Sequence, residues 1–159
     1  MAKNKEEKTN VMRVLEQKKI AYTAHTYPHE EGMAVDGVTV AKSMGFDPAI
    51  VFKTLVARGA SKQYYVFDVP VAENLDLKKA AKAVGEKSIE MIHQKELLPL
   101  TGYVHGGCSP VGMKKLFPTV FHSSAENLAA MIVSAGKIGY QVELSPHDLA
   151  ALVRAKFAD

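Results

Sequence analysis

A lysine stands in the middle of a segment that otherwise has the composition of a buried β-strand. Residues 50–57, Ile-Val-Phe-Lys-Thr-Leu-Val-Ala, are rich in β-branched and aromatic side chains, which is typical of a strand. Side chains alternate between the two faces of a strand, so Lys53 shares its face with Val51 and Leu55. An ammonium group removed from water is costly unless it is paired. Lys53 is therefore either the charge of an edge strand that reaches solvent or a cation held in a pocket for a ligand.

Two glycine-rich segments could bring backbone N–H groups close to a ligand. They are residues 106–112, Gly-Gly-Cys-Ser-Pro-Val-Gly, and residues 134–139, Ser-Ala-Gly-Lys-Ile-Gly. Successive backbone N–H groups can cradle a carbonyl or phosphate oxygen. Neither segment has the spacing of a phosphate loop or of a dinucleotide-binding loop, and each could also be an ordinary tight turn. Their presence together with Lys53 in one short chain favours a ligand site.

Other reactive side chains give weaker indications. Cys108 lies three residues after His105 and could be a nucleophile with a nearby base, but a lone cysteine more often fills space in a core. His25 and His29 are four residues apart, which would suit a metal on a helix, yet Pro28 between them opposes a helix. The sequence therefore predicts no metal site and no cofactor.

Length and composition describe an ordinary globular protein. The 159 residues fit one domain, and we expect a flexible segment at 1–8 followed by a single domain at 9–159. The net charge of +3 permits a nucleic-acid partner without requiring one. A single cysteine indicates a reducing compartment, and we find neither a signal peptide nor an apolar run of membrane-spanning length. These features predict a cytoplasmic protein that does not bind membranes.

The elements that must position Lys53 and the glycine-rich segments follow from periodicity and from start and stop signals. Helices are expected over 11–19 with Thr9 or Asn10 as the cap, from a cap at Asp36 to Gly45, and from Asn74 or Asp76 to Gly85. Further helices are expected over 93–98 before Pro99, briefly after a cap at Ser124, and from Ser145 toward Phe157. Strands are expected over 20–26, 50–57, 63–69, 88–92, 119–122, 131–134 and 140–144. The irregular alternation predicts an α+β fold, with a mixed, mostly antiparallel, curved or barrel-like sheet flanked by helices.

Several of these segments together resemble a known family. They are residues 25–27 (His-Thr-Tyr), 52–55 (Phe-Lys-Thr-Leu), 74–80 (Asn-Leu-Asp-Leu-Lys-Lys-Ala), 101–103 (Thr-Gly-Tyr), 106–115 and 134–139. In combination they resemble the YbaK-type aminoacyl-tRNA deacylases, which are free-standing relatives of the editing domain of bacterial prolyl-tRNA synthetase. The resemblance extends from Val11 to Phe157 and implies the same mixed, barrel-like fold.

The resemblance also implies a reaction. The expected substrate is Cys-tRNA(Pro), and Cys-tRNA(Cys) is a further candidate. The substrate's own thiol is expected to attack its ester carbonyl, which would explain why no protein nucleophile, metal or acid–base pair stands out. Cysteine and proline have similar volumes, so a synthesis pocket discriminates poorly between them and a second site must remove the error. The implied partners are the tRNA 3′ end and prolyl-tRNA synthetase.

Roles for individual residues follow from the resemblance in the same way. Lys53 would be the catalytic residue, holding the terminal ribose or phosphate or offsetting negative charge. The implied substrate-binding residues are Tyr27, Phe52, Thr54, Gly106, Gly107, Ser109, Ser134, Gly136 and Lys137, with the Gly106 and Gly107 N–H groups facing the acyl carbonyl. Some family members carry an acidic residue where this chain has Gln141, so the counter-ion of Lys53 stays open.

Two other functions are compatible with the sequence. A non-catalytic module could dock on an aminoacylated tRNA end or on a synthetase, because catalytic groups are scarce. A Schiff-base enzyme could use Lys53 as its amine, although nothing else in the sequence supports that chemistry.

Overall fold

The computed structural model describes residues 8–28 and 36–158. Its helices are α1 (Asn10–Gln17), α2 (Gly37–Ser43), α3 (Leu77–Val84), α4 (Gln94–Thr101) and α5 (Pro146–Val153), with short 3-10 turns η2 (Pro48–Ile50) and η3 (Ser123–Ala125). Its strands are β1 (Tyr22–Thr26), β2 (Phe52–Gly59), β3 (Tyr64–Pro70), β4 (Ile89–Met91), β5 (Thr119–His122), β6 (Met131–Ser134), β7 (Tyr140–Leu144) and β8 (Lys156–Ala158). Apart from Lys8, the predicted flexible segment at 1–8 lies outside the described residues.

The described strands form two sheets. One has the order β1-β7-β6 and is antiparallel, and the other has the order β4-β2-β3-β5-β8. In the larger sheet the β2–β3 and β2–β4 pairs are antiparallel, whereas β3–β5 and β5–β8 are parallel. A parallel bridge between Val51 and Ile132 connects the two sheets. The predicted α+β class with a mostly antiparallel sheet is confirmed, and its strands stop short of a closed barrel.

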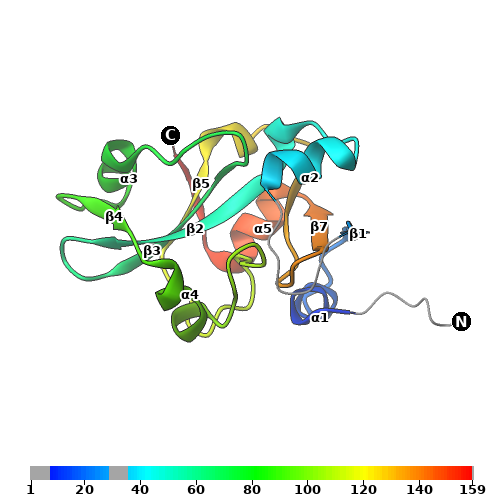
Figure 1. Cartoon of the computed structure of the whole chain (residues 1–159), viewed down its shortest axis with the longest axis horizontal. Helices are drawn as coiled ribbons and strands as arrows, with labels where there is room; N and C mark the ends of the chain where they lie inside the picture. The colour runs from blue at the N-terminus through cyan, green and yellow to red at the C-terminus, as the bar shows by residue number, and fades with distance from the viewer. Residues whose placement is uncertain (1–7, 29–35, 159) are drawn as a thin grey trace, which may run out of the picture.

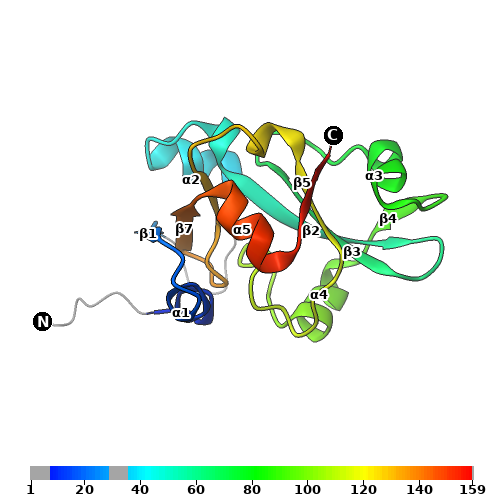
Figure 2. The same cartoon turned by 180° about the vertical axis from the view of Figure 1, so that it is seen from behind.

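Figures 1 and 2 show how the helices are distributed around this framework. The long β2–β3 ribbon runs along the molecule, with α3 and β4 near one end and α1 and the three-stranded sheet near the other. The main buried cluster contains Val11 from α1, Phe121 from β5, Val142 from β7 and Leu149 from α5. Because this cluster joins a strand of each sheet to α1 and α5, burial of its apolar surface holds the two sheets together. No helix in the described part of the chain has the length and apolarity needed to cross a membrane.

Side-chain caps fix where most helices begin. Thr9, Asp36, Asp76 and Ser145 each accept a hydrogen bond from a backbone N–H in the first turn of α1, α2, α3 and α5, respectively. Such caps satisfy donors that a helix cannot pair internally. The predicted starts of these helices are thus confirmed, and Gly85 ends α3 in the left-handed conformation, as expected.

Three local predictions were wrong. Pro99 lies inside α4, which continues to Thr101 and ends at Gly102, because one missing N–H is tolerated where the exposed helix face meets water. The cap of η3 is His122, whose ring nitrogen accepts from the Ser124 N–H, rather than Ser124 itself. The last helix ends at Val153, and the chain then adds β8, because the positive φ of Arg154 stops the helix.

One edge of β2 is open along the half that carries Lys53. Strand β3 pairs with β2 from Phe52 to Arg58, but on the opposite edge β4 pairs only with Ala57–Gly59. The sheet-joining bridge at Val51 ends just before Lys53. Among the described residues, the stretch between these contacts has no ladder partner on that edge, which leaves room for a cavity.

Candidate functional site

A cavity of about 330 Å³ lies along the open edge of β2. Lys53 lines it together with its neighbours Phe52 and Thr54. The opposite walls come from three separate parts of the chain, which contribute Tyr27, His105 with Gly106, and Ser134 with Tyr140 and Gln141. The fold therefore brings Lys53 together with both glycine-rich segments, as the sequence predicted.

Lys53 is half-buried and makes no ion pair or hydrogen bond with another described residue. Asp36 also lines the cavity, but its Oδ2 accepts the Thr39 N–H at 3.1 Å as the cap of α2. The strand edge beside Lys53 is open, as in the edge-strand hypothesis, yet this edge faces a cavity. The ammonium is thus placed to meet a ligand oxygen that enters from this side.

The two glycine-rich turns are packed backbone against backbone. A β-carbon added at Gly107 would lie 3.1 Å from the backbone nitrogen of Ile138, so a side chain at this position would push the turns apart. Gly106 has a φ of 91°, a conformation that favours glycine. The Gly107 N–H donates to Val104 O at 3.0 Å. That donor is engaged within its own loop, which leaves Gly106 as the glycine of this loop that lines the cavity.

Tyr27 and Ser134 hold the opposite wall. The Tyr27 N–H donates to Gly139 O at 2.9 Å, which ties the end of β1 to the second glycine-rich turn. Ser134 Oγ accepts the Gly136 N–H at 3.1 Å and so stabilises the start of the same turn. These two contacts fix the position of this cavity wall.

Four predicted substrate-binding residues do not line the cavity. They are Gly107, Ser109, Gly136 and Lys137. Ser109 is fully buried, and its Oγ accepts the Val111 N–H at 3.2 Å, so it shapes the loop. Gly136 has a φ of 93° and supports the turn, whereas the Lys137 ammonium lies 5.5 Å from the Tyr140 ring centroid. Their contribution is to the turns that carry the lining residues.

Two polar side chains at or next to the cavity were not among the predicted site residues. Asp68 on β3 lies opposite Thr54 on β2, and the Thr54 hydroxyl donates to Asp68 Oδ1. Burial raises the pKa of this carboxyl to about 7, against the opposing effect of the Thr54 hydrogen bond. Gln141 lines the cavity, is 8% exposed and has an Oε1 atom without a hydrogen-bond partner among the described residues. A ligand donor could satisfy that buried acceptor.

The sequence of this chain is similar to that of proteins in a known family. The sequence model of the aminoacyl-tRNA editing domain matches residues 29–152. A candidate Cys-tRNA(Pro)/Cys-tRNA(Cys) deacylase of Enterococcus faecalis, EbsC, is 45% identical over 160 residues, covering 100% of this chain and 97% of its own length. The chain belongs to the aminoacyl-tRNA editing domain family.

Solved structures agree with that assignment. A candidate trans-editing enzyme for prolyl-tRNA synthetase matches with a TM-score of 0.77 at 25% identity, covering 94% of each chain. The hypothetical protein APE2540 matches with a TM-score of 0.82 at 19% identity, covering 94% of this chain and 97% of that chain, which supports the fold alone. The likeness in sequence to the YbaK-type deacylases is therefore confirmed as a family relationship.

The cavity of this editing domain contains one thiol, which is not positioned as a nucleophile. Cys108 is 7% exposed, and burial, with a smaller contribution from Asp68, raises its pKa to about 12. The thiolate, which is the reactive form, is thus disfavoured. Elsewhere, His25 Nε2 contacts Glu143 Oε1 at 2.8 Å, and His29 lies outside the described residues. No group of three metal-ligating side chains occurs in residues 8–28 and 36–158.

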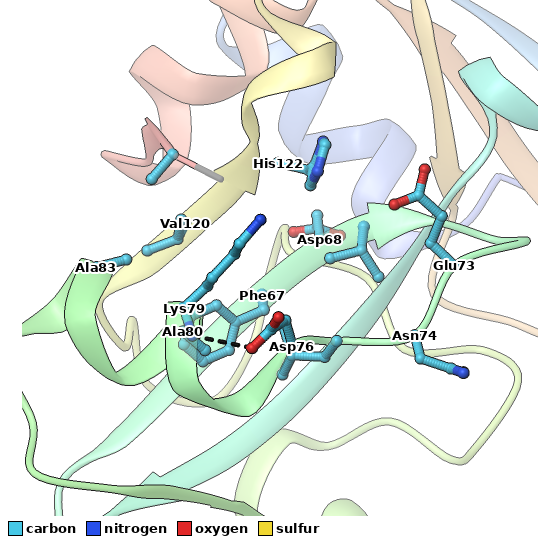
Figure 3. A pocket seen from close by; sticks show the side chains of 13 residues that line it. Phe67, Asp68, Glu73, Asn74, Asp76, Lys79, Ala80, Ala83, Val120 and His122 are labelled. Atoms are coloured by element: carbon cyan, nitrogen blue, oxygen red, sulfur yellow. Dashed lines mark hydrogen bonds between the residues drawn. The ribbon is translucent and has the colours of Figure 1, made fainter.

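A second cavity, of about 260 Å³, lies under α3. Figure 3 shows Lys79 extending over it from α3, with His122 on the far side. Its lining combines apolar side chains, such as Phe67 and Val120, with polar ones, among them Asp76, which caps α3. This α3 cavity contains neither Lys53 nor a glycine-rich turn.

Proposed function

We propose that this protein is a trans-editing deacylase that removes cysteine from mischarged Cys-tRNA(Pro). The observation that carries the proposal is the half-buried ammonium of Lys53 in a cavity bordered by both glycine-rich turns. Support also comes from the 45% identity to EbsC over essentially both chains. The cavity is large enough for an aminoacyl group and part of the terminal adenosine. We further propose that Cys-tRNA(Cys) is a second substrate, because the name of EbsC includes that tRNA as well.

The reaction that we propose uses the thiol of the substrate. The sulfur attacks the carbonyl carbon of the aminoacyl ester, the bond to the ribose oxygen breaks, and the thiol proton passes to that oxygen. The products are deacylated tRNA and a cyclic thioester of cysteine, which water opens to free cysteine. This route requires no nucleophile from the protein, which orients the two reacting groups of the substrate.

Lys53 has an electrostatic role in this scheme. Negative charge develops on the ester oxygens as the carbonyl carbon becomes tetrahedral, and a pre-positioned cation stabilises that charge most strongly where water is partly excluded. The Gly106 N–H is the backbone donor that we assign to the same oxygen. Tyr27, Phe52 and Ser134 line the remaining walls and would limit the shape of the aminoacyl group.

A deacylation panel tests the function. Purified protein is incubated with tRNA(Pro) charged with Cys, Ala, Ser or Pro, and with Cys-tRNA(Cys). We expect the cysteinyl tRNAs to lose their amino acid at least about 100-fold faster than Pro-tRNA(Pro), because only they carry the attacking thiol. S-methylcysteinyl-tRNA(Pro) is the matched control, since it has nearly the same shape but no nucleophile.

Two outcomes would contradict the proposal. Equal hydrolysis of the S-methyl substrate would rule out attack by the substrate thiol and would point to activated water. Tight binding of every aminoacyl-tRNA without turnover would identify a non-catalytic binding module.

We also propose prolyl-tRNA synthetase as a partner, on the basis of the similarity to a candidate trans-editing enzyme for that synthetase. Co-sedimentation of the two proteins with and without tRNA(Pro) tests this association.

A further inference from the structure

Asp68 is a buried carboxyl group without a countercharge. It lies within β3 and is 0% exposed. The Thr54 hydroxyl donates to its Oδ1, while its Oδ2 has no hydrogen-bond partner in the described part of the chain. No described lysine, arginine or histidine forms an ion pair with it. A carboxyl group in this setting is costly for the fold, so its place behind the Lys53 cavity calls for a functional account.

The groups around Asp68 are few and can be named. Thr54 faces it from β2 and itself lines the Lys53 cavity. Cys108, from the first glycine-rich segment, is close enough for the Asp68 charge to contribute to its raised pKa. On the other side of the sheet, Asp68 contributes to the floor of the α3 cavity (Figure 3). The titratable residues that line that cavity with it are Glu73, Asp76, Lys79 and His122.

The Thr54 hydroxyl has a single proton, and Asp68 determines where that proton points. When Asp68 is ionised it can only accept, so Thr54 donates to it and presents lone pairs to the cavity. When Asp68 is protonated, a proton on Oδ2 would have no acceptor among the described residues. A proton on Oδ1 can instead be donated to Thr54, which frees the hydroxyl proton for the cavity.

We propose that Asp68 is a positioning residue that sets the hydrogen-bond polarity of Thr54 in the Lys53 cavity. In the ionised state Thr54 accepts a hydrogen bond from a primary ammonium group next to an ester carbonyl, which is the chemistry of an aminoacyl ester. In the protonated state Thr54 is a donor and repels that ammonium. This inference rests on the proposed function for the identity of the ligand, but not for the geometry of the Thr54–Asp68 pair.

The environment of Asp68 places this change near neutral pH. Burial raises its pKa to about 7, so ionised and protonated forms coexist under ordinary conditions. The substrate ammonium and thiol also titrate in or near this range. Their titration is the same for every variant of the protein, so it cancels when two variants are compared at the same pH.

The test compares wild type with Asp68→Asn. The amide is nearly isosteric, does not titrate and can donate to Thr54, so it mimics protonated Asp68. The ratio of wild-type to variant kcat/KM for Cys-tRNA(Pro) is measured from about pH 5.5 to 8.5. We expect a ratio near one at the acidic end that rises to about tenfold at the alkaline end, which corresponds to one hydrogen bond to a charged group.

Variants of Thr54 separate this effect from a structural one. Thr54→Ser should keep the rise of the ratio with pH, because it keeps the hydroxyl. In a Thr54→Val background, Asp68→Asn should cause no further change at any pH. The inference would be overturned by a wild-type to Asp68→Asn ratio that does not change with pH. It would also be overturned if Asp68→Asn had the same effect in the Thr54→Val background as in wild type.

A binding measurement distinguishes failure of the inference from failure of the proposed function. The probe is a non-hydrolysable amide analogue of 3′-cysteinyl adenosine, titrated into both proteins by calorimetry across the same pH range. Binding that weakens below about pH 7 in wild type but not in Asp68→Asn, without turnover of any aminoacyl-tRNA, would leave the inference standing and refute the deacylase. Turnover of Cys-tRNA(Pro) by wild type, with identical pH profiles for both proteins, would support the deacylase and refute the inference about Asp68. Absence of both binding and turnover would refute both.

Discussion

Two cavities flank the same β2–β3 ribbon, and they differ in how their polar groups are satisfied. Around the α3 cavity, Asp76 accepts the Lys78 and Lys79 N–H groups at 3.1 Å each, and Lys79 is on an exposed helix surface. In the Lys53 cavity, the Lys53 ammonium is half-buried and Gln141 Oε1 has no partner in the described chain. Both cavities have room for a small ligand. Asp68 Oδ2, in the lining of the α3 cavity, also has no partner in the described chain, so an unpaired acceptor does not separate the two cavities. The difference teaches that a half-buried cation without a countercharge, rather than cavity size, marks the candidate site.

The largest expected effect concerns the two lysines. Lys53→Ala should lower the single-turnover rate of Cys-tRNA(Pro) deacylation by about 100-fold or more, because it removes the cation that stabilises the developing charge. Lys79→Ala is the matched control from the α3 cavity, and its rate at saturating enzyme should change by less than about threefold. Similar losses in both variants, or an active Lys53→Ala protein with unchanged circular dichroism, would abolish the distinction between the cavities.

A second prediction uses stability and concerns Asp68, which lies between the cavities. A carboxyl group whose pKa is raised on folding holds its proton in the native state after the unfolded chain has released it. Its contribution to stability is therefore fully present below the ordinary value of 3.8 and is lost as the pH rises to about 7. Over that window the free energy of unfolding of wild type should fall relative to Asp68→Asn by several kcal/mol.

Urea denaturation of both proteins at a series of pH values measures this difference. The free energy of unfolding of wild type, taken relative to that of Asp68→Asn, should be lower at about pH 8 than at about pH 4. Parallel pH profiles of the two proteins would show that the Asp68 carboxyl titrates normally, and the polarity change at Thr54 would then fall outside the neutral range.

The contact between the glycine-rich turns gives a third prediction. Gly107→Ala should force the Ile138 backbone away and cost about 1–3 kcal/mol of stability, with a loss of deacylation rate of about tenfold. Gly45→Ala is the control for lost stability without a steric contact, because Gly45 has a positive φ, of 77°, and open space around it. It should cost about 1 kcal/mol with no change in rate. Equal rate losses in both would show that the effect is one of stability alone.

A smaller effect is expected at Gln141. Gln141→Ala should raise KM for Cys-tRNA(Pro) about fivefold with little change in kcat, since it removes one neutral acceptor from the ligand site. Gln141→Glu would instead place a carboxylate in the cavity of Lys53 and should lower kcat, because an internal ion pair competes with the developing charge. An unchanged KM in Gln141→Ala would mean that the buried amide oxygen does not meet the ligand.

The smallest effect is expected at Cys108. Cys108→Ala should retain the deacylation rate within about threefold, because a thiol whose pKa is raised to about 12 does not supply a thiolate at neutral pH. The measurement is the same single-turnover assay, with a thiol-modifying reagent as a second probe of wild type. Loss of activity in Cys108→Ala at unchanged stability would instead support the hypothesis that Cys108 is a nucleophile.

Much of the secondary structure was predictable because its signals are local. The caps at Thr9, Asp36, Asp76 and Ser145 mark helix starts through contacts within one turn. Strand β8 was not predictable in this way. Its three residues pair in parallel with β5, and nothing in the local sequence of Lys156–Ala158 indicates that pairing. The helical pattern that begins at Ser145 also predicted that the last helix would continue toward Phe157.

The candidate site was predicted in part for a similar reason. Lys53 stood out because a charge interrupts an apolar strand, and the same signal was present at Asp68, between Phe67 and Val69 in an equally apolar strand. Applying the same argument there would have found it. Gln141 was considered only as a substitute for an absent carboxylate, because its unpaired oxygen depends on packing between β1, β6 and β7. Pairing of this kind between distant segments cannot be read from local pattern.

Pairing between β1 and β7 also constrains the order in which the molecule can be built. Residues 22–26 form their ladder with residues 140–144, so the first described strand has no partner until most of the chain has been synthesised. Such distant contacts carry a loop-closure penalty before they are rewarded, which slows folding. The β2–β3 hairpin, in contrast, can form from consecutive residues. A ribosome-bound nascent chain would thus display Lys53 on a hairpin well before Gln141 completes the opposite wall, and ligand binding would begin only after the three-stranded sheet closes.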